Sequence, residues 1–118
     1  MARADFEDAL NDTDEIDLIT TGRRSGQESS RPVWFVRQED VVYLLPVTGS
    51  DSQWYRNVLE TPDIRLSAAG AELRARATPV TDPAEVDRVV DMFRARYGSG
   101  DVEAYYPKHD VAVEVRLR

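Results

Sequence analysis

Three arginines lie close together in an otherwise acidic chain. The stretch TTGRRSGQESSRPVWF, from Thr20 to Phe35, carries Arg23, Arg24 and Arg31 beside two glycines and several hydroxyl side chains. Glycine lets the backbone turn its N–H groups outward, and arginine presents a permanently charged fork that suits phosphate or carboxylate. The segment is therefore a candidate anion site, and the alternative is a solvated hairpin turn with ordinary surface arginines. Its spacing matches neither a phosphate-binding P-loop nor a dinucleotide fingerprint.

A second candidate is the stretch SDSQWYRNV, which follows a Gly49-Ser50 turn. Trp54, Tyr55 and Asn57 fall at the start of an expected helix, where free N–H groups and positive potential favour an anion. An aromatic side chain at that place can stack on a flat ring. The alternative is that Trp54 belongs to the core and Asn57 bonds to backbone.

The third candidate is AYYPKHD, with Tyr105, Tyr106 and His109. His109 is the only histidine and the chain has no cysteine, so neither a multi-histidine nor a thiolate metal site is expected. The two tyrosines either line a ligand or cover one end of the fold. No serine–histidine–acid set is recognisable.

Periodicity indicates the elements that must position these residues. Apolar spacing predicts helices over residues 3–11, 83–97 and, briefly, 101–106, and a fourth that begins at Ser50 or Asp51 and ends before Pro62. Thr81 or Asp82 is expected to cap helix 83–97, and Gly98 to end it. Strands are expected over residues 15–21, 30–36, 41–47, 63–68, 72–80 and 111–117. Six short strands with helices between them predict a mainly β, α+β fold: a small six-stranded antiparallel barrel in one domain, residues 1–118.

Charge and composition restrict the class of protein. With 22 acidic against 15 basic residues the net charge is −7, so nucleic acid is not an expected partner. No stretch is long and apolar enough for a membrane span, and no signal-peptide core precedes the first predicted helix. Together with the lack of cysteine, these features predict a cytoplasmic protein.

Two stretches together resemble a known family. LITTGRRSGQESSRPVWF followed by GSDSQWYRNVLETPDIRL is similar to the deazaflavin (F420)-dependent nitroreductase/quinone reductase family, within the flavin/deazaflavin oxidoreductase superfamily. The likeness runs from about Ile16 to Leu66. It implies a split β-barrel of the FMN-binding type, often a homodimer, that binds coenzyme F420 or FMN.

By position, the resemblance implies a set of cofactor-binding residues. The phosphate segment falls on the first arginine turn, the next strand lies along the ring, and the second candidate stretch completes the pocket: Gly22, Arg23, Arg24, Ser25, Gly26, Arg31, Pro32, Val33, Trp34, Gly49, Ser50, Trp54, Tyr55 and Asn57. Two departures are visible. Glu28-Ser29 stand where the family has Pro-Arg, and the loop before Trp54 has Asp51 and no lysine. Both departures are expected to weaken a phosphate site, and they disfavour the polyglutamate tail of F420 more than FMN.

The resemblance implies an oxidoreductase that passes hydride between F420 or FMN and a quinone, nitroaromatic or other electron-poor small molecule. Tyr55, Tyr105 and Tyr106 are the candidates for proton donation or ring lining. Two alternatives stay open at this stage. One is a barrel that binds a flavin-like or other anionic small molecule without turnover, and the other is a structural dimer module with a vestigial pocket.

Overall fold

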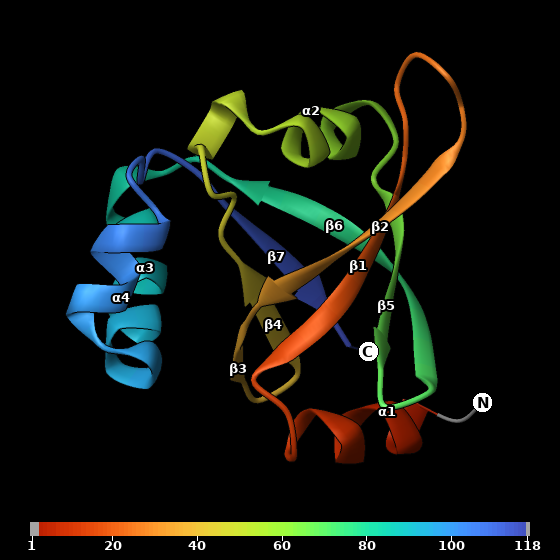
Figure 1. Cartoon of the computed structure of the whole chain (residues 1–118), viewed down its shortest axis with the longest axis horizontal. Helices are drawn as coiled ribbons and strands as arrows, with labels where there is room; N and C mark the ends of the chain where they lie inside the picture. The colour runs from red at the N-terminus through yellow and green to blue at the C-terminus, as the bar shows by residue number, and fades with distance from the viewer. Residues whose placement is uncertain (1–2, 118) are drawn as a thin grey trace.

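The computed structural model describes residues 3–117, which form a curled antiparallel sheet with helices around it (Figure 1). The sheet has the order β2-β1-β5-β6-β7-β4-β3. Its strands are β1 (Glu15–Thr21), β2 (Glu28–Trp34), β3 (Val36–Gln38), β4 (Val41–Leu44), β5 (Asp63–Ala68), β6 (Ala71–Val80) and β7 (Ala112–Arg116). The α+β split-barrel prediction is confirmed, but the number of strands is seven rather than six.

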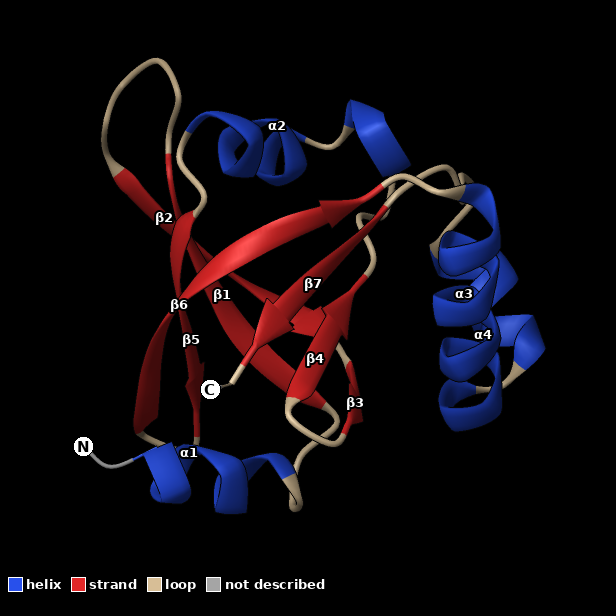
Figure 2. Ribbon diagram, turned by 180° about the vertical axis from the view of Figure 1, so that it is seen from behind, coloured by secondary structure: helices blue, strands red, loops and turns tan. Residues whose placement is uncertain are grey.

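The extra strand arises because the predicted strand over residues 30–36 is divided at Phe35. Its first part, β2, pairs with β1, and its second part, β3, pairs with β4. These two parts are the two ends of the sheet order, although only one residue separates them in the chain. The sheet therefore curls so that its two end strands adjoin through Phe35. The view from behind shows this curl (Figure 2).

Helices cover the two ends and one side of the barrel (Figures 1 and 2). They are α1 (Arg3–Leu10), the 3-10 turn η1 (Gly49–Asp51), α2 (Gln53–Glu60), α3 (Pro83–Tyr97) and α4 (Ser99–Tyr105). The expected cap of α3 is confirmed, because the Asp82 carboxylate accepts a hydrogen bond from the Glu85 N–H at 3.1 Å. The expected start of the second helix is wrong: Ser50 and Asp51 lie in η1, and Ser52 occupies the cap position of α2. No helix among residues 3–117 is long and apolar enough to cross a membrane.

Two buried clusters hold these layers together. The first fills the barrel and includes Leu18, Leu66 and Val113, each fully buried, with Trp54 closing one end. The second lies between the sheet and α3 and includes Val89 and Phe93. In β4 and just beyond it, side chains alternate between the clusters, since Val42 and Leu44 point into the barrel whereas Tyr43 and Leu45 face the helices. The predicted alternation of Val111, Val113, Val115 and Leu117 is confirmed, because all four belong to the first cluster.

Candidate functional site

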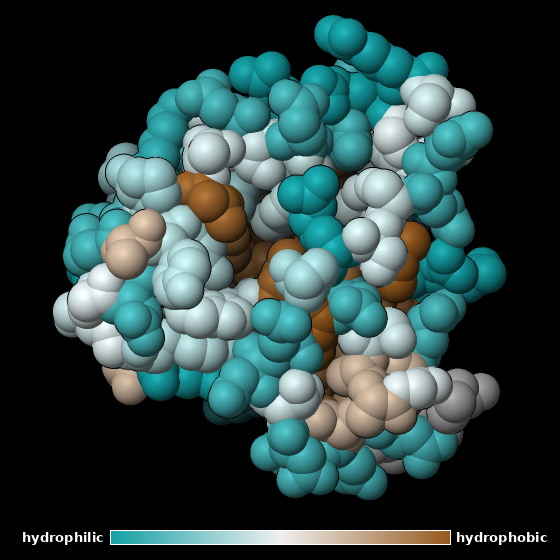
Figure 3. Space-filling model, viewed as in Figure 1, coloured by the Kyte–Doolittle hydropathy of each residue, from teal (hydrophilic) through white to brown (hydrophobic). Residues whose placement is uncertain are grey.

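A groove of about 830 Å³ lies where β2 separates from the segment that follows β4. The register of β3 and β4 pairs Val36 with Tyr43, so continued pairing would bring Trp34 opposite Leu45. Instead the two segments line opposite sides of the groove. The lining residues are Glu15, Arg31, Pro32, Val33, Trp34, Leu45, Val47, Thr48, Asp51, Ser52, Gln53, Trp54, Tyr105 and Tyr106. In the space-filling view, hydrophobic surface lies in a hollow between the α3–α4 side and the strands (Figure 3).

One wall of the groove is aromatic. The ring of Trp34 stacks on Tyr97 with a centroid separation of 4.3 Å, and it meets Tyr105 edge to face at 5.1 Å. Tyr106 also approaches Trp34 edge to face, at 6.1 Å. Burial raises the pKa of Tyr106 far above the usual tyrosine value, so its hydroxyl stays protonated at neutral pH. Flat faces of this kind suit a planar ring, and a protonated phenol offers it a hydrogen-bond donor.

Charged groups occupy the groove's rim. The Arg31 side chain is exposed and has no ion-pair or hydrogen-bond partner within residues 3–117. The Asp51 carboxylate accepts a hydrogen bond from Lys108 at 2.9 Å and lies 3.3 Å from the Arg56 guanidinium. The hydrogen bond and charge of Lys108 lower the pKa of Asp51. The negative charge of Asp51 is therefore balanced by two cations that lie later in the sequence.

The arginine loop between β1 and β2 uses most of its own N–H groups. Gly22 N–H donates to the Gln27 carbonyl at 2.8 Å, Gly26 N–H donates to the Gly22 carbonyl at 2.9 Å, and Gln27 N–H donates to Ser25 Oγ at 3.1 Å. Arg23 N–H donates to Asn57 Oδ1 at 3.2 Å. A ligand at this loop would therefore meet the N–H groups of Arg24 and Ser25 and the arginine side chains, rather than a full ring of backbone donors.

Arg23 joins that loop to α2. Its Nη1 donates to Asn57 Oδ1 at 2.8 Å, and its Nη2 donates to Gln53 Oε1 at 2.8 Å. Both acceptors are neutral amides, so the guanidinium charge is held in place without being cancelled. Because Gln53 and the adjacent Trp54 line the groove, this contact brings the positive charge of Arg23 next to the groove. Arg24 is exposed and has no partner in the described part of the chain.

Glu28, one of the two sequence departures, lies elsewhere. Its carboxylate pairs with Arg65 Nη2, and Arg65 also reaches Glu72 at 3.3 Å. Glu28 lines a second hollow of about 490 Å³ on the β1–β5–β6 face, together with Ile19 and Arg74, and it does not line the groove. The Glu28 carboxylate is thus paired with Arg65 of β5, a contact that the sequence did not predict.

The structure brings seven of the 16 candidate cofactor-binding and catalytic residues into the groove lining. Arg31, Pro32, Val33, Trp34, Trp54, Tyr105 and Tyr106 line it, whereas Gly22, Arg23, Arg24, Ser25, Gly26, Gly49, Ser50, Tyr55 and Asn57 lie outside its lining. Tyr55 is only 3% exposed and packs in the barrel cluster, where burial raises its pKa. Ser50 is held by Asp110, which accepts hydrogen bonds from both the Ser50 N–H and its hydroxyl.

Sequence reasoning missed several groove residues. Leu45 and Val47 could have been found by continuing the β3–β4 register past its last pair. Glu15 lines the groove because it lies opposite Trp34 in the pairing of β1 with β2. Tyr97, which stacks behind Trp34, gave no local signal, since the contact joins residues far apart in the chain.

Solved structures share this fold. The chain has a TM-score of 0.68 and 17% identity to an F420-H2 dependent reductase (FDR-A), over 87% of this chain and 94% of that one. It has a TM-score of 0.69 and 17% identity to a structure described as a domain-swapped dimer, over 97% and 96%. It has a TM-score of 0.71 and 14% identity to HutZ, described as a heme storage protein from Vibrio cholerae, over 96% and 87%. Identities this low establish the fold alone.

Comparison of the sequence finds fewer similar proteins than comparison of the structure. No curated protein matches the chain. One family model, described as "Uncharacterized protein conserved in bacteria (DUF2255)", matches residues 8–117. That span contains every strand, the arginine loop and the whole groove lining. The chain therefore belongs to the DUF2255 family.

Proposed function

We propose that this protein binds a flavin-type cofactor, coenzyme F420 or FMN, in the groove and acts as an oxidoreductase on an electron-poor small molecule. The observation that supports this function best is the juxtaposition of an aromatic groove with an arginine loop that α2 holds beside it. A volume of about 830 Å³ lies within the range of roughly 300–1,000 Å³ that is usual for cofactor sites.

The residues present fit such a group. The ring system would lie along β2 from Arg31 to Trp34, with Tyr105 and Tyr106 beside the indole. The phosphate would lie toward the loop, where Arg23 keeps its charge and Arg24 is free to turn to an anion. The bound cofactor would supply the hydride chemistry. The chain would orient the ring and exclude water, and the Tyr106 hydroxyl would offer the ring a hydrogen bond, since its raised pKa makes it a hydrogen-bond donor rather than a ready source of protons.

The two cofactors place different demands on the rim. FMN needs one cationic patch for its phosphate, whereas the acidic tail of F420 needs further positive charge. The exposed Arg31 side chain supplies part of this positive charge. Lys108 neutralises Asp51 through their hydrogen bond and is therefore not free to bind the tail. Both cofactors should therefore be tested for binding. Whichever cofactor binds should then be offered quinones and nitroaromatic compounds as hydride acceptors.

The groove is open to one side, so a second copy of the chain is proposed to complete it. The fold likeness to a structure described as a domain-swapped dimer supports a homodimer. Closed two-fold dimers are also the commonest oligomers of soluble proteins. Light scattering at several protein concentrations would test this assembly.

Titration with oxidised and reduced FMN and F420, followed by fluorescence at two salt concentrations, tests the cofactor proposal. Binding should weaken with salt, because screening reduces the attraction of exposed arginines for an anion. The Arg23→Ala/Arg24→Ala variant should bind at least about tenfold more weakly. Arg74→Ala/Arg76→Ala is the matched control, since it removes two exposed arginines of β6 that do not line the groove.

Two results would remove this proposal. Failure of wild-type protein to bind either cofactor would exclude the oxidoreductase function. Unchanged affinity in Arg23→Ala/Arg24→Ala would exclude the arginine loop as the phosphate contact.

A second function, binding without turnover, is favoured by the fold likeness to a protein described as a heme storage protein. The two functions differ in what happens to a reduced cofactor. An oxidoreductase would oxidise bound reduced FMN or F420 when offered quinones and nitroaromatic compounds. A carrier would bind it and leave it reduced with every acceptor in the panel.

A further inference from the structure

At Phe35, next to the groove residue Trp34, one extended segment changes partners. On one side of Phe35 β2 pairs with β1, and on the other β3 pairs with β4. Phe35 itself belongs to neither ladder. Its N–H donates to the Tyr97 hydroxyl at 3.1 Å, and that hydroxyl donates to the Phe35 carbonyl at 2.6 Å. A side chain from α3 therefore takes the place of a neighbouring strand at the point where the groove begins.

The same hydroxyl reaches the neighbouring strand. The carbonyl of Asp14, one residue before β1, lies 2.9 Å from Tyr97 Oη. The next residue, Glu15, lines the groove and pairs with Trp34 across the sheet. A single phenol thus contacts the residue before β1 and the residue after β2, and the neighbours of these two residues, Glu15 and Trp34, line the groove.

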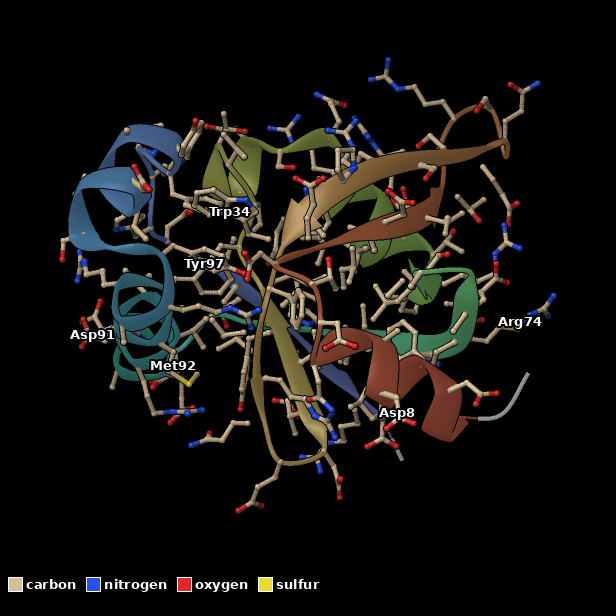
Figure 4. All side chains as sticks on the ribbon, turned by 60° about the horizontal axis from the view of Figure 1, so that its bottom comes forward. Asp8, Trp34, Arg74, Asp91, Met92 and Tyr97 are labelled. Carbon is tan, nitrogen blue, oxygen red and sulfur yellow. The ribbon has the colours of Figure 1, made fainter. Side chains whose placement is uncertain are left out.

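The ring of Tyr97 supports the groove wall from behind. It stacks on Trp34 with an interplanar angle of 12°, and Phe93 packs against it at 5.8 Å. Figure 4 shows Trp34 and Tyr97 next to each other between α3 and the strands. Trp34 lines the groove whereas Tyr97 does not, so Tyr97 can orient the indole without touching a ligand.

We propose that Tyr97 is a positioning residue for the groove. Its hydroxyl holds the backbone at Phe35, between the end of β2 and the start of β3, and its ring fixes the orientation of Trp34 against a bound ring. This inference depends on the proposed function in one respect, namely that the groove is the site where the cofactor binds. A groove of fixed width is needed because a displacement of about 1 Å at a binding site commonly lowers affinity or rate severely.

Tyr97→Phe tests this role, because it removes the hydroxyl and keeps a ring that can stack. Tyr43→Phe is the matched control. Tyr43 belongs to the same buried cluster, and its hydroxyl also takes part in one contact, accepting from Arg88 Nη2 at 3.0 Å, but it does not line the groove. Both variants are compared for amide hydrogen exchange at Phe35 by NMR, for acrylamide quenching of Trp34 in a Trp54→Phe background, and for FMN and F420 affinity.

If Tyr97 positions the groove, the Phe35 amide of Tyr97→Phe exchanges at least about tenfold faster, because this N–H has lost its acceptor and the Phe35 carbonyl its donor. Cofactor binding weakens by about tenfold. Quenching of Trp34 also increases. Tyr43→Phe leaves all three within about twofold. Unchanged exchange and unchanged affinity in Tyr97→Phe would overturn the proposal.

The outcome stays decisive if wild-type protein binds neither cofactor. That result removes the proposed function, and the role of Tyr97 is then decided by Phe35 exchange and Trp34 quenching alone. A change in both supports the role, and no change in either refutes it.

Discussion

The contact between Arg23 and α2 predicts that two adjacent arginines, identical in charge, differ in their effect on stability. Arg23→Ala removes the side-chain hydrogen bonds to Asn57 and Gln53, both at 2.8 Å. Arg24→Ala removes an exposed side chain that has no partner in residues 3–117. The first change should destabilise the cofactor-free protein, and the second should leave its stability almost unchanged.

The magnitude follows from how exposed each bond is. The bond to Asn57 is partly buried and contributes about 1 kcal/mol, and the exposed bond to Gln53 contributes about 0.5 kcal/mol. Arg23→Ala should therefore cost about 1.5 kcal/mol, or roughly 6 °C in Tm for a chain of this size. Asn57→Ala should cost about 2 kcal/mol, because it also leaves the Arg23 N–H without its acceptor. Arg24→Ala should stay within about 0.5 kcal/mol of wild type.

Urea unfolding of wild type, both single variants and the Arg23→Ala/Asn57→Ala double variant provides the assay. A double-mutant cycle should give a coupling of about 1 kcal/mol between these two side chains. The reasoning fails if Arg23→Ala is no more destabilising than Arg24→Ala, or if the coupling is below about 0.3 kcal/mol.

Other perturbations test the remaining features. Gly49→Ala should destabilise by more than about 2 kcal/mol in urea, because Gly49 has a φ of 58° and a Cβ there would lie 2.1 Å from Asp110 Oδ1. Val113→Asp should lose at least about 3 kcal/mol and much of its cooperative thermal transition by circular dichroism, since it places a charge at a fully buried position. Tyrosine burial should also limit alkaline stability. A folded pKa above the unfolded value near 10 means that the native state retains protons which the unfolded state loses, so stability falls as the pH rises past 10. Tyr106→Phe should make that decline shallower by up to about 1.4 kcal/mol per pH unit, and an unchanged slope in pH-dependent urea titrations would contradict it.

The sequence predicted those helices and strands whose limits depend on residues close to them in the chain. Helix α3 begins and ends as expected because Asp82 and Gly98 act within one turn of it. The final strand was predicted correctly because Val111, Val113, Val115 and Leu117 alternate strictly and all face the barrel interior. The division of one expected strand at Phe35 was missed, since the Tyr97 hydroxyl that bonds the Phe35 backbone lies 62 residues away in the chain.

The candidate site was harder to predict from the sequence, because its contacts also join residues that are far apart in the chain. Glu28 and Asp51 looked unfavourable for an anion because each adds a negative charge to a stretch that resembles a phosphate site. Arg65 and Lys108, which pair with these carboxylates, lie 37 and 57 residues away in the chain. Tyr55 was a candidate for ring lining because of the family resemblance, but the orientation of α2 directs it into the barrel. Whether the proposed residues bind a cofactor stays a prediction.

The position of β7 in the sheet affects how the chain reaches its native state. β7 is the last strand in the chain, yet it lies between β6 and β4. The hairpins β1–β2, β3–β4 and β5–β6 join near neighbours and can form early during synthesis. Until β7 inserts, the edges of β4 and β6 remain open to pairing with other molecules. Slow β7 insertion would therefore expose nascent chains to aggregation, which makes the late residues 112–116 a determinant of folding yield.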